Sequence, residues 1–280
     1  TPWHIDDVIS EIRNNPDIPK APEVKVGPNF ESPWPEKHST EYFIEQMKIL
    51  HRKHFNRAYR LVALDDSEAW VNLNALNQAR DFTLKVTDII ANQEIPKFTG
   101  VDLGHRSGAE NCPSVIFTVA YMPDGRRVPV DIRISQDASP LAIVKVLINV
   151  QQTYNSVLTL VENVGAQEYI VELVKQLGPG DHKIEGFFTG ASNKFDPATG
   201  LPSLFAEIEN GKWVIPLGTG GDHTDACQCH FCRWIQELHD YPNGKTDTVM
   251  ASFMAWQALR KIKEKANAGG GFQIWSYSDV

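Results

Sequence analysis

The sequence predicts an α/β fold with a mixed β-sheet of about five or more strands and helices on both faces. Strand-like segments begin only after residue 96. The first of them is followed by a hairpin, and the hairpin is followed by alternating helical and strand-like segments. A βαβ alternation after an antiparallel hairpin needs both parallel and antiparallel pairs, so the sheet is expected to be mixed.

The chain before the sheet is expected to be a mostly helical or irregular connector. Residues 1–38 are rich in Pro, Asn and charged side chains, which is typical of a connector rather than of an independent core. Residues 39–62 are expected to form a helix capped by Ser39, because apolar side chains recur there at roughly helical spacing. A second helical or irregular stretch is expected over 67–91, so 39–95 is assigned as a helical linker.

The sheet domain is expected to span residues 96–266, with 267–280 as a tail. Its strands are expected at 97–104, 114–121, 126–134, 156–162 and 182–188, with a shorter β-like segment at 211–216. The dipeptide Asp124-Gly125 predicts a tight hairpin between the second and third strands. Helices are expected at 138–155, where Pro140 stands in the first turn, and at 165–178, 201–209, 227–239 and 246–266.

Composition limits the classes of function. The net charge of −8 excludes a general nucleic-acid coat, so any DNA contact is expected to be local. The sequence has no apolar run of transmembrane length and no signal-peptide pattern, so we expect a soluble intracellular protein that is neither secreted nor bound to a membrane. Because the chain begins at Thr1, within a motif described below, we expect a fragment or a processed product.

Three acids are candidate metal ligands. Asp102 ends the first strand, Glu162 ends the fourth, and Asp247 opens the last long helix. If these strands are neighbours, the carboxylates meet at one edge, where they would repel one another unless divalent cations such as Mg²⁺ or Mn²⁺ bind between them. Ordinary structural roles remain as alternatives. Asp102 would cap a turn, Glu162 would interact with the N-terminus of the following helix, and Asp247 would be an acid in the first turn of its helix.

A second candidate cluster lies between residues 223 and 232. It contains His223, Cys227, Cys229, His230 and Cys232. Three thiolates and one imidazole satisfy tetrahedral Zn²⁺, and His223, Cys227, Cys229 and Cys232 are the candidate ligands. The chain has no second C-x-x-C pair, and a helix over 227–239 would explain some of the cysteines by packing alone. This comparison favours reduced cysteines over zinc.

Six segments, in the order in which they occur in the chain, resemble the C-terminal nuclease half of the large terminase subunit of tailed double-stranded DNA bacteriophages. The first, TPWHIDDVISEI, is similar to a segment near the end of that family's packaging ATPase domain. The segment SPWPEKHSTEYFIEQ resembles the connector that follows it. The remaining segments resemble the family's nuclease signatures: GVDLG, LVENVGAQEYIVELV, NK with GLPSLFAEIENGKWVIP, and WIQELHDYPNGKTDTVMASFMAW.

The resemblance implies an RNase H-like fold and an endonuclease that cuts concatemeric viral DNA with two divalent metal ions. It places the three catalytic acids on Asp102, Glu162 and Asp247, and it suggests a phosphate contact for Lys194. Where the family often has two adjacent acids, this chain has Thr246-Asp247, so one acid of the doublet is missing.

The resemblance also implies a cellular setting. The expected partners are double-stranded DNA, the portal protein, the small terminase subunit and the chain's own ATPase domain, to whose end residues 1–38 would belong. The expected location is the host-cell cytoplasm, with transient attachment to the procapsid portal. No G-x-x-x-x-G-K-[ST] loop is present, so ATP-driven DNA translocation is expected only of a longer parent chain.

Two other functions remain open. One is a different RNase H-like enzyme, such as a junction resolvase or a transposase-type enzyme, which would share the acids and differ in substrate. The other is a non-catalytic docking module with a degenerate nuclease fold, which the missing acid of the doublet favours. For the nuclease, backbone contacts to DNA are expected from local basic residues, with Arg106, Arg126 and Arg127 as candidates.

Overall fold

The computed structural model describes residues 38–51, 53–55, 59, 69–104, 106–107, 110–137, 139–162, 168–178, 183–218, 223 and 227–267. Expectations for residues 1–37 and for the tail from 268 onward lie outside the described residues. The chain divides into two compact units, one made of residues 1–76 and 191–211 and the other of 77–190 and 212–280. Within the described ranges, no helix is both long and apolar enough to cross a membrane.

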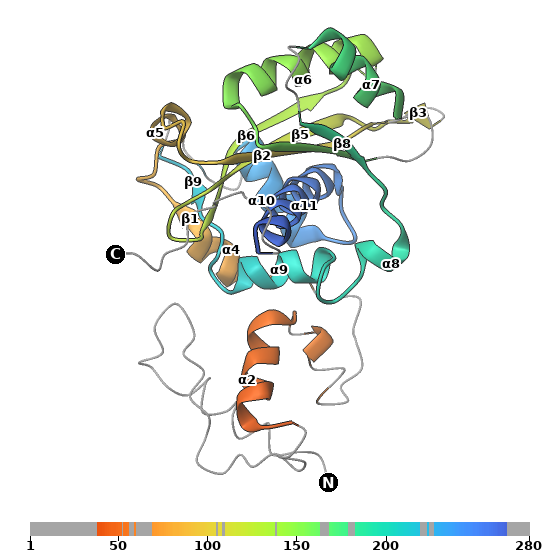
Figure 1. Cartoon of the computed structure of the whole chain (residues 1–280). Helices are drawn as coiled ribbons and strands as arrows, with labels where there is room; N and C mark the ends of the chain where they lie inside the picture. Colours follow the sequence, from red (N-terminus) through yellow and green to blue (C-terminus); the bar gives the residue numbers. More distant parts are fainter. Residues whose placement is uncertain are drawn as a thin grey trace. The chain divides into compact units, whose positions relative to one another are not determined.

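The larger unit is built on a five-stranded mixed sheet of order β6-β5-β2-β7-β8. Strand β5 pairs antiparallel with β2 and with β6, whereas β2, β7 and β8 run parallel. This arrangement confirms the predicted mixed sheet (Figure 1). The strands are β2 (Lys97–Asp102), β5 (Ser114–Tyr121), β6 (Arg127–Ser135), β7 (Leu158–Glu162) and β8 (Ile184–Phe187).

Helices cover both faces of this sheet. On one face lie α6 (Pro140–Tyr154) and α7 (Glu168–Leu177), and on the other lie α10 (His230–Asp240) and α11 (Asp247–Asn267) (Figure 1). Strand residues Val101 and Val161 belong to the apolar core that includes α6 and α7 residues such as Leu147 and Val174. Since successive strand residues alternate between faces, the residues next to these two valines face α11.

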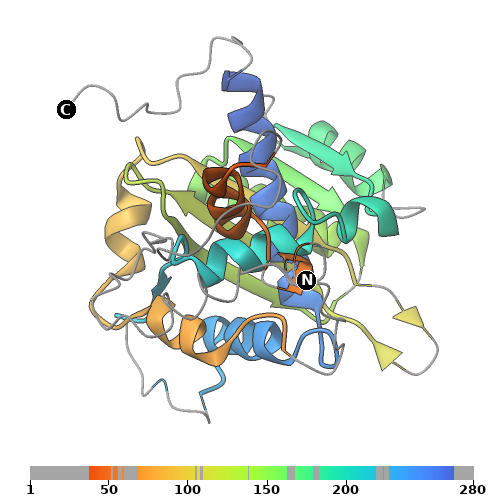
Figure 2. The ribbon, with the colours of Figure 1, turned by 90° about the horizontal axis from the view of Figure 1, so that it is seen from below.

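The contact between α11 and the sheet is unusually close at Gly100 of β2. A Cβ atom added at Gly100 would overlap the backbone of Ala251 and Ala255 in α11, so only glycine fits there. At the other end of the helix, Lys263 Nζ lies 3.2 Å from the hydroxyl of Tyr121, which is next to the start of β2. The helix therefore runs antiparallel to β2, and its first residue lies toward the end of β2. Figure 2 shows α11, in dark blue, lying against the sheet.

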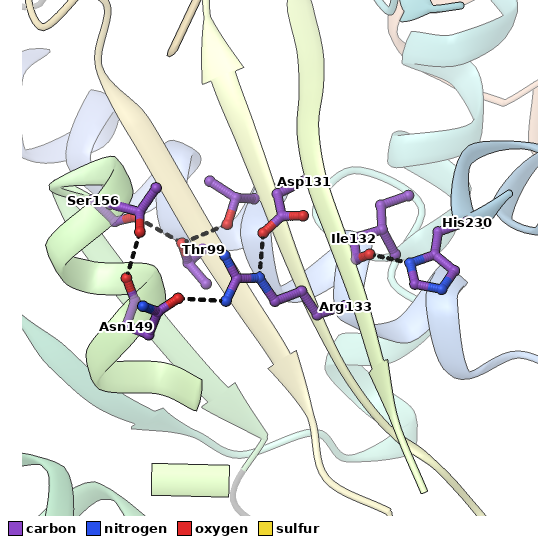
Figure 3. A network of polar contacts seen from close by, with 9 residues as sticks. Thr99, Asp131, Ile132, Arg133, Asn149, Ser156 and His230 are labelled. Carbon is purple, nitrogen blue, oxygen red and sulfur yellow. Dashed lines mark hydrogen bonds and ion pairs between the residues drawn. The ribbon is translucent and has the colours of Figure 1, made fainter. Parts of the chain in front are cut away.

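Polar side chains link β2 to β5 inside the sheet and link the edge strand β6 to α6. The Thr99 hydroxyl lies 3.1 Å from the Thr118 hydroxyl and 2.7 Å from that of Ser156 (Figure 3). Nearby, Arg133 donates from Nε to Asp131 at 2.6 Å and from Nη1 to the Oδ1 of Asn149 at 2.7 Å (Figure 3). These bonds satisfy the buried hydroxyls of Thr99 and Thr118, which would otherwise destabilise the core.

Several short elements were not expected. Strand β1 (Arg80–Asp81) and the pair of strands β3 (Arg106–Ser107) and β4 (Glu110–Asn111), directly after β2, lie where no strand was predicted. Strand β1 pairs with β9 (Ile215–Pro216), which lies within the β-like segment predicted at 211–216. Two-residue strands carry too little periodic pattern to be recognised in a sequence. Two short helices, α4 (Leu73–Ala79) and α5 (Val86–Ala91), fall in the expected helical or irregular stretch.

The smaller unit contains α2 (Thr40–Ile49), α8 (Ala191–Lys194) and α9 (Leu201–Glu209). The predicted cap is confirmed, because the Ser39 hydroxyl accepts a hydrogen bond of 3.3 Å from the backbone N–H of Tyr42. Glu209 at the end of α9 accepts a 3.1 Å bond from the backbone N–H of Asn72.

Candidate active site

The carboxyl ends of two neighbouring parallel strands carry the first two predicted acids. The register pairs Val101 with Val161, so the next residues, Asp102 and Glu162, stand level on strands about 4.8 Å apart. Both side chains are half-buried, and both point to the face of the sheet covered by α11. The fold therefore brings together two acids separated by sixty residues of sequence.

The third predicted acid lies toward the same edge. Asp247 is the first residue of α11, and the antiparallel course of this helix along β2 carries its start past Gly100 toward Asp102. We call Asp102, Glu162 and Asp247 together the acid edge.

Hydrogen bonds and an ion pair orient these acids. Glu162 accepts a short hydrogen bond from the hydroxyl of Thr189, which follows β8. Asp247 is 20% exposed, and its Oδ2 lies 3.7 Å from Nη2 of Arg233 on α10. A cation at this distance stabilises the ionised carboxylate.

A fourth acid, Glu237 on α10, has a structural role that the sequence analysis missed. It is 5% exposed and accepts bonds from the backbone N–H of Thr248 at 2.8 Å and from the Thr248 hydroxyl at 2.6 Å. It also accepts a 2.9 Å bond from Nε of Arg233. Glu237 thus caps the start of α11 from a neighbouring helix and holds Asp247 in place. The spacing of Arg233 and Glu237 by four residues on a helix was the available signal.

The donors of the acid edge suit hard divalent cations. Carboxylate oxygens with open positions are the ligands that Mg²⁺ and Mn²⁺ take in phosphodiester-cleaving sites. Among the described residues, the three acids do not form a group whose ligand atoms all lie within 4.8 Å of one another. Two ions about 3.5–4 Å apart need a wider ring of ligands than one ion does, so this spread is compatible with a two-ion site.

Two further predicted contacts, Lys194 and Arg106, lie on short elements outside the acid edge. Lys194 ends α8 in the smaller unit, where its Nζ lies 5.7 Å from the ring centroid of Phe195. The backbone of Arg106 forms part of β3 immediately after β2, and its side chain lies outside the described part. The roles suggested for both residues remain predictions.

The other two candidate DNA contacts lie at the opposite end of the sheet. Arg126 and Arg127 follow the β5–β6 turn, where Gly125 has φ +84° as a tight hairpin requires. Arg126 pairs with Asp124 at 2.6 Å. Arg127 is 7% exposed, and its guanidinium lies over the ring of Tyr121 at 5.6 Å. A DNA contact by Arg127 would require a buried side chain to become exposed.

The cysteine–histidine cluster, His223, Cys227, Cys229 and Cys232, is brought together by the fold. Their ligand atoms all lie within 4.8 Å of one another, the only such group among the described residues. The helix predicted from residue 227 begins at His230 instead, with Cys229 as its N-cap, so Cys227 lies in the preceding loop. Backbone N–H donation from Cys229 lowers the pKa of the Cys227 thiol to about 7, whereas burial raises the pKa of the Cys232 thiol.

Comparison with known proteins bears on the fold. No family model and no curated protein matches this chain. Among solved structures, the human cytomegalovirus terminase nuclease domain is 11% identical, with a TM-score of 0.49 over 66% of this chain and 93% of that domain. The large terminase nuclease from thermophilic phage G20c with bound zinc is 16% identical, with a TM-score of 0.44 over 59% of this chain and 82% of that one.

A third structure covers more of the chain. The large terminase of bacteriophage HK97 is 9% identical, with a TM-score of 0.50 over 77% of this chain. The chain spans about half of that protein, 49% of its length. The fold is therefore RNase H-like, the class predicted from the sequence. At these identities the likeness to the three terminase structures concerns the fold alone.

Proposed function

We propose that this chain is the nuclease part of a large terminase and cuts double-stranded viral DNA during genome packaging with the help of divalent metal ions. The observation that carries the proposal is the level placement of Asp102 and Glu162 on adjacent parallel strands, facing the helix that Asp247 opens. The RNase H-like fold supports it, because ligands in open α/β sheets bind outside the carboxyl ends of the strands.

Each residue of the acid edge has a distinct task in this proposal. Asp102 and Glu162 would hold the ions, and Asp247 would complete the site from the helix start. Bound divalent ions supply an activated water and neutralise charge on the phosphate that is cut. The Thr189 hydroxyl orients Glu162, and the ion pair with Arg233 orients Asp247. DNA would be held through its backbone, so sequence specificity would be low.

The proposal includes a longer parent chain and its partner proteins. A parent chain with an ATPase domain would move the DNA, and a portal protein and a small terminase subunit would be its partners. The 280 residues contain no phosphate-binding G-x-x-x-x-G-K-[ST] loop, so ATP hydrolysis is not proposed for this chain.

One observation favours a second candidate function, a non-catalytic docking module. Thr246 stands where a second acid is often found, and Arg233 already pairs with Asp247. A metal ion would have to compete with this guanidinium for the third carboxylate. An enzyme assay separates the two candidates.

The test is nicking of supercoiled plasmid in Mg²⁺ or Mn²⁺ by the wild type and by Asp102→Asn. The proposal expects nicking by the wild type and none by the variant. The matched control is Asp124→Asn, since Asp124 is 42% exposed in the hairpin at the opposite end of the sheet. If none of the three proteins nicks the plasmid, the result supports the non-catalytic docking module. Cleavage of four-way junctions but not of linear duplex would instead indicate a resolvase.

A further inference from the structure

We propose that the cysteine–histidine cluster binds one structural zinc ion through Nδ1 of His223 and the thiolates of Cys227, Cys229 and Cys232. This site is separate from the acid edge and differs from it in donor type. The proposal rests on distances, on the hydrogen bonds around the sulfurs and on the position of the neighbouring histidine.

The distances match those around a tetrahedral zinc ion. Zn–S bonds of about 2.3 Å and Zn–N bonds of about 2.0–2.1 Å place a nitrogen and a sulfur ligand about 3.6 Å apart. In the structure, His223 Nδ1 lies 3.6 Å from Cys227 Sγ, 3.6 Å from Cys229 Sγ and 3.5 Å from Cys232 Sγ. One nitrogen is thus equidistant from three sulfurs, as a common central ion requires.

Hydrogen bonding alone does not account for this arrangement. A neutral imidazole nitrogen has either one proton or one lone pair, so it makes one good hydrogen bond. Three sulfurs at the same distance from one nitrogen leave at least two of them without such a bond. A cation between the four atoms satisfies all of them at once.

The backbone around the sulfurs stabilises thiolates. The N–H of Cys229 points to Cys227 Sγ at 3.5 Å, and the N–H of Cys232 points to Cys229 Sγ at 3.4 Å. Cys229 also caps the first turn of α10, where the helix dipole favours negative charge. The loop and the helix start therefore provide N–H donors to two of the three sulfurs.

The other histidine of this segment has a different partner. His230 lies between Cys229 and Cys232 in sequence, but its Nδ1 donates to the carbonyl oxygen of Ile132 on β6 (Figure 3). This bond attaches the start of α10 to the sheet and directs the ring of His230 to β6. His223 is therefore the nitrogen ligand, as the chemistry of a closed four-ligand site requires.

The donor type identifies the metal. Three thiolates and a neutral imidazole around Zn²⁺ carry one net negative charge, and the hollow of about 390 Å³ that borders Cys227 and Cys232 is lined by three cations, Arg80, Arg233 and Lys245, and by two acids, Glu237 and Asp240. A tetrahedral set of soft sulfur ligands and one imidazole selects zinc over Mg²⁺ or Mn²⁺. All four positions are filled by protein atoms, which is the property of a structural and not a catalytic zinc.

The position of the cluster suggests what the ion stabilises. Cys232 directly precedes Arg233, and Arg233 contacts both Glu237 and Asp247. An ion that fixes the first turn of α10 therefore also fixes the residues that hold the start of α11.

The test measures metal and thiols on the full 280-residue chain. Protein purified without chelator is expected to contain one zinc ion per chain by elemental analysis. In native protein a thiol reagent should react only with Cys112, and after a chelator removes the zinc it should react with all four cysteines. Replacement by Co²⁺ should give the visible absorption of a tetrahedral thiolate site.

Matched variants assign the ligands. Cys232→Ser is expected to lose the zinc, whereas Cys112→Ser, which removes the one cysteine outside the cluster, should retain it. Asp102→Asn should also retain it, which separates this site from the acid edge. If Cys232→Ser does not fold, the thiol counts on wild-type protein still decide. Wild-type protein without zinc whose four thiols react alike, and which gives no Co²⁺ spectrum, overturns the proposal.

Discussion

The acid edge is assembled from residues far apart in sequence, whereas the cysteine–histidine cluster comes from ten residues, 223–232. The acids stand on strand ends and a helix start that are held by the core of the larger unit. The cluster depends on a loop and on one helix cap. Hard oxygen donors spread along an edge leave positions for substrate, whereas four soft donors close around one ion.

The two sites therefore differ in what positions their ligands. The acid edge is positioned by the fold as a whole, through the register of β2 with β7 and the close packing of α11 on Gly100. The cluster supplies its own geometry once its ion is bound. We therefore expect mutations in the sheet to disturb the acid edge and leave zinc in place, and mutations at the cluster to release zinc first.

The largest effect is expected for Glu162→Gln. Loss of this carboxylate should lower nicking by on the order of 10³-fold, at least as much as removal of one preorganised transition-state donor. Zinc content should not change. The matched control is Glu185→Gln on the adjacent strand β8, where Glu185 pairs with Lys261. Equal activity of both variants in the plasmid assay would remove Glu162 from the active site.

The acid edge shows what a sequence can predict. Strand ends at Asp102 and Glu162 follow from apolar runs that stop at an acid. The sequence only allowed these two strands to be neighbours, and the structure shows that they pair in parallel. The ion pair of Asp247 with Arg233 and the cap by Glu237 could not be predicted, since they depend on how α10 packs on α11.

The geometry of the cysteine–histidine cluster could not be predicted from the sequence for a related reason. Its residue types suggest zinc, but a helix starting at Cys227 would have pointed the ligands in different directions. The helix instead starts at His230, which leaves Cys227 and His223 in a loop that can turn back. The start of a helix depends on tertiary contacts, here the bond from His230 to Ile132, and these are not visible in the sequence.

The second prediction concerns Gly100→Ala. A methyl group there overlaps the backbone of α11, so we expect a loss of about 2–3 kcal/mol in the free energy of unfolding, as overpacking of a core causes. Nicking should fall because Asp247 moves away from Asp102, while zinc content stays the same. Chemical denaturation and the plasmid assay measure the two effects.

A glycine at a turn is the control for this change. An added Cβ at Gly125 would meet only the Tyr121 hydroxyl at 3.7 Å, although its φ of +84° disfavours alanine. Gly125→Ala should therefore cost about 1–2 kcal/mol and leave nicking unchanged. A loss of nicking as large as that of Gly100→Ala would show that stability, and not the position of α11, controls activity.

The third prediction tests the link between the two regions. Glu237→Gln removes a buried charge that holds Thr248 and Arg233, and we expect a loss of about 2 kcal/mol, typical of hydrogen bonds to charged groups. Both nicking and zinc retention during dialysis against a chelator should weaken. Glu264→Gln is the control, since Glu264 is 69% exposed and pairs only loosely with Arg260 at 3.5 Å. If Glu237→Gln weakens neither property, the two regions are independent.

The smallest effect is expected for His230→Ala. This variant removes the bond that attaches the cluster to the sheet and leaves the four proposed metal ligands in place. Loss of the bond to the Ile132 carbonyl should lower the free energy of unfolding by about 1 kcal/mol, the net value of one hydrogen bond. Zinc should remain, because the four ligands are intact, and His223→Ala should release it. Denaturation curves and zinc analysis of the two variants provide the comparison. Release of zinc by His230→Ala together with its retention in His223→Ala would exchange the two histidines and require a different geometry for the cluster.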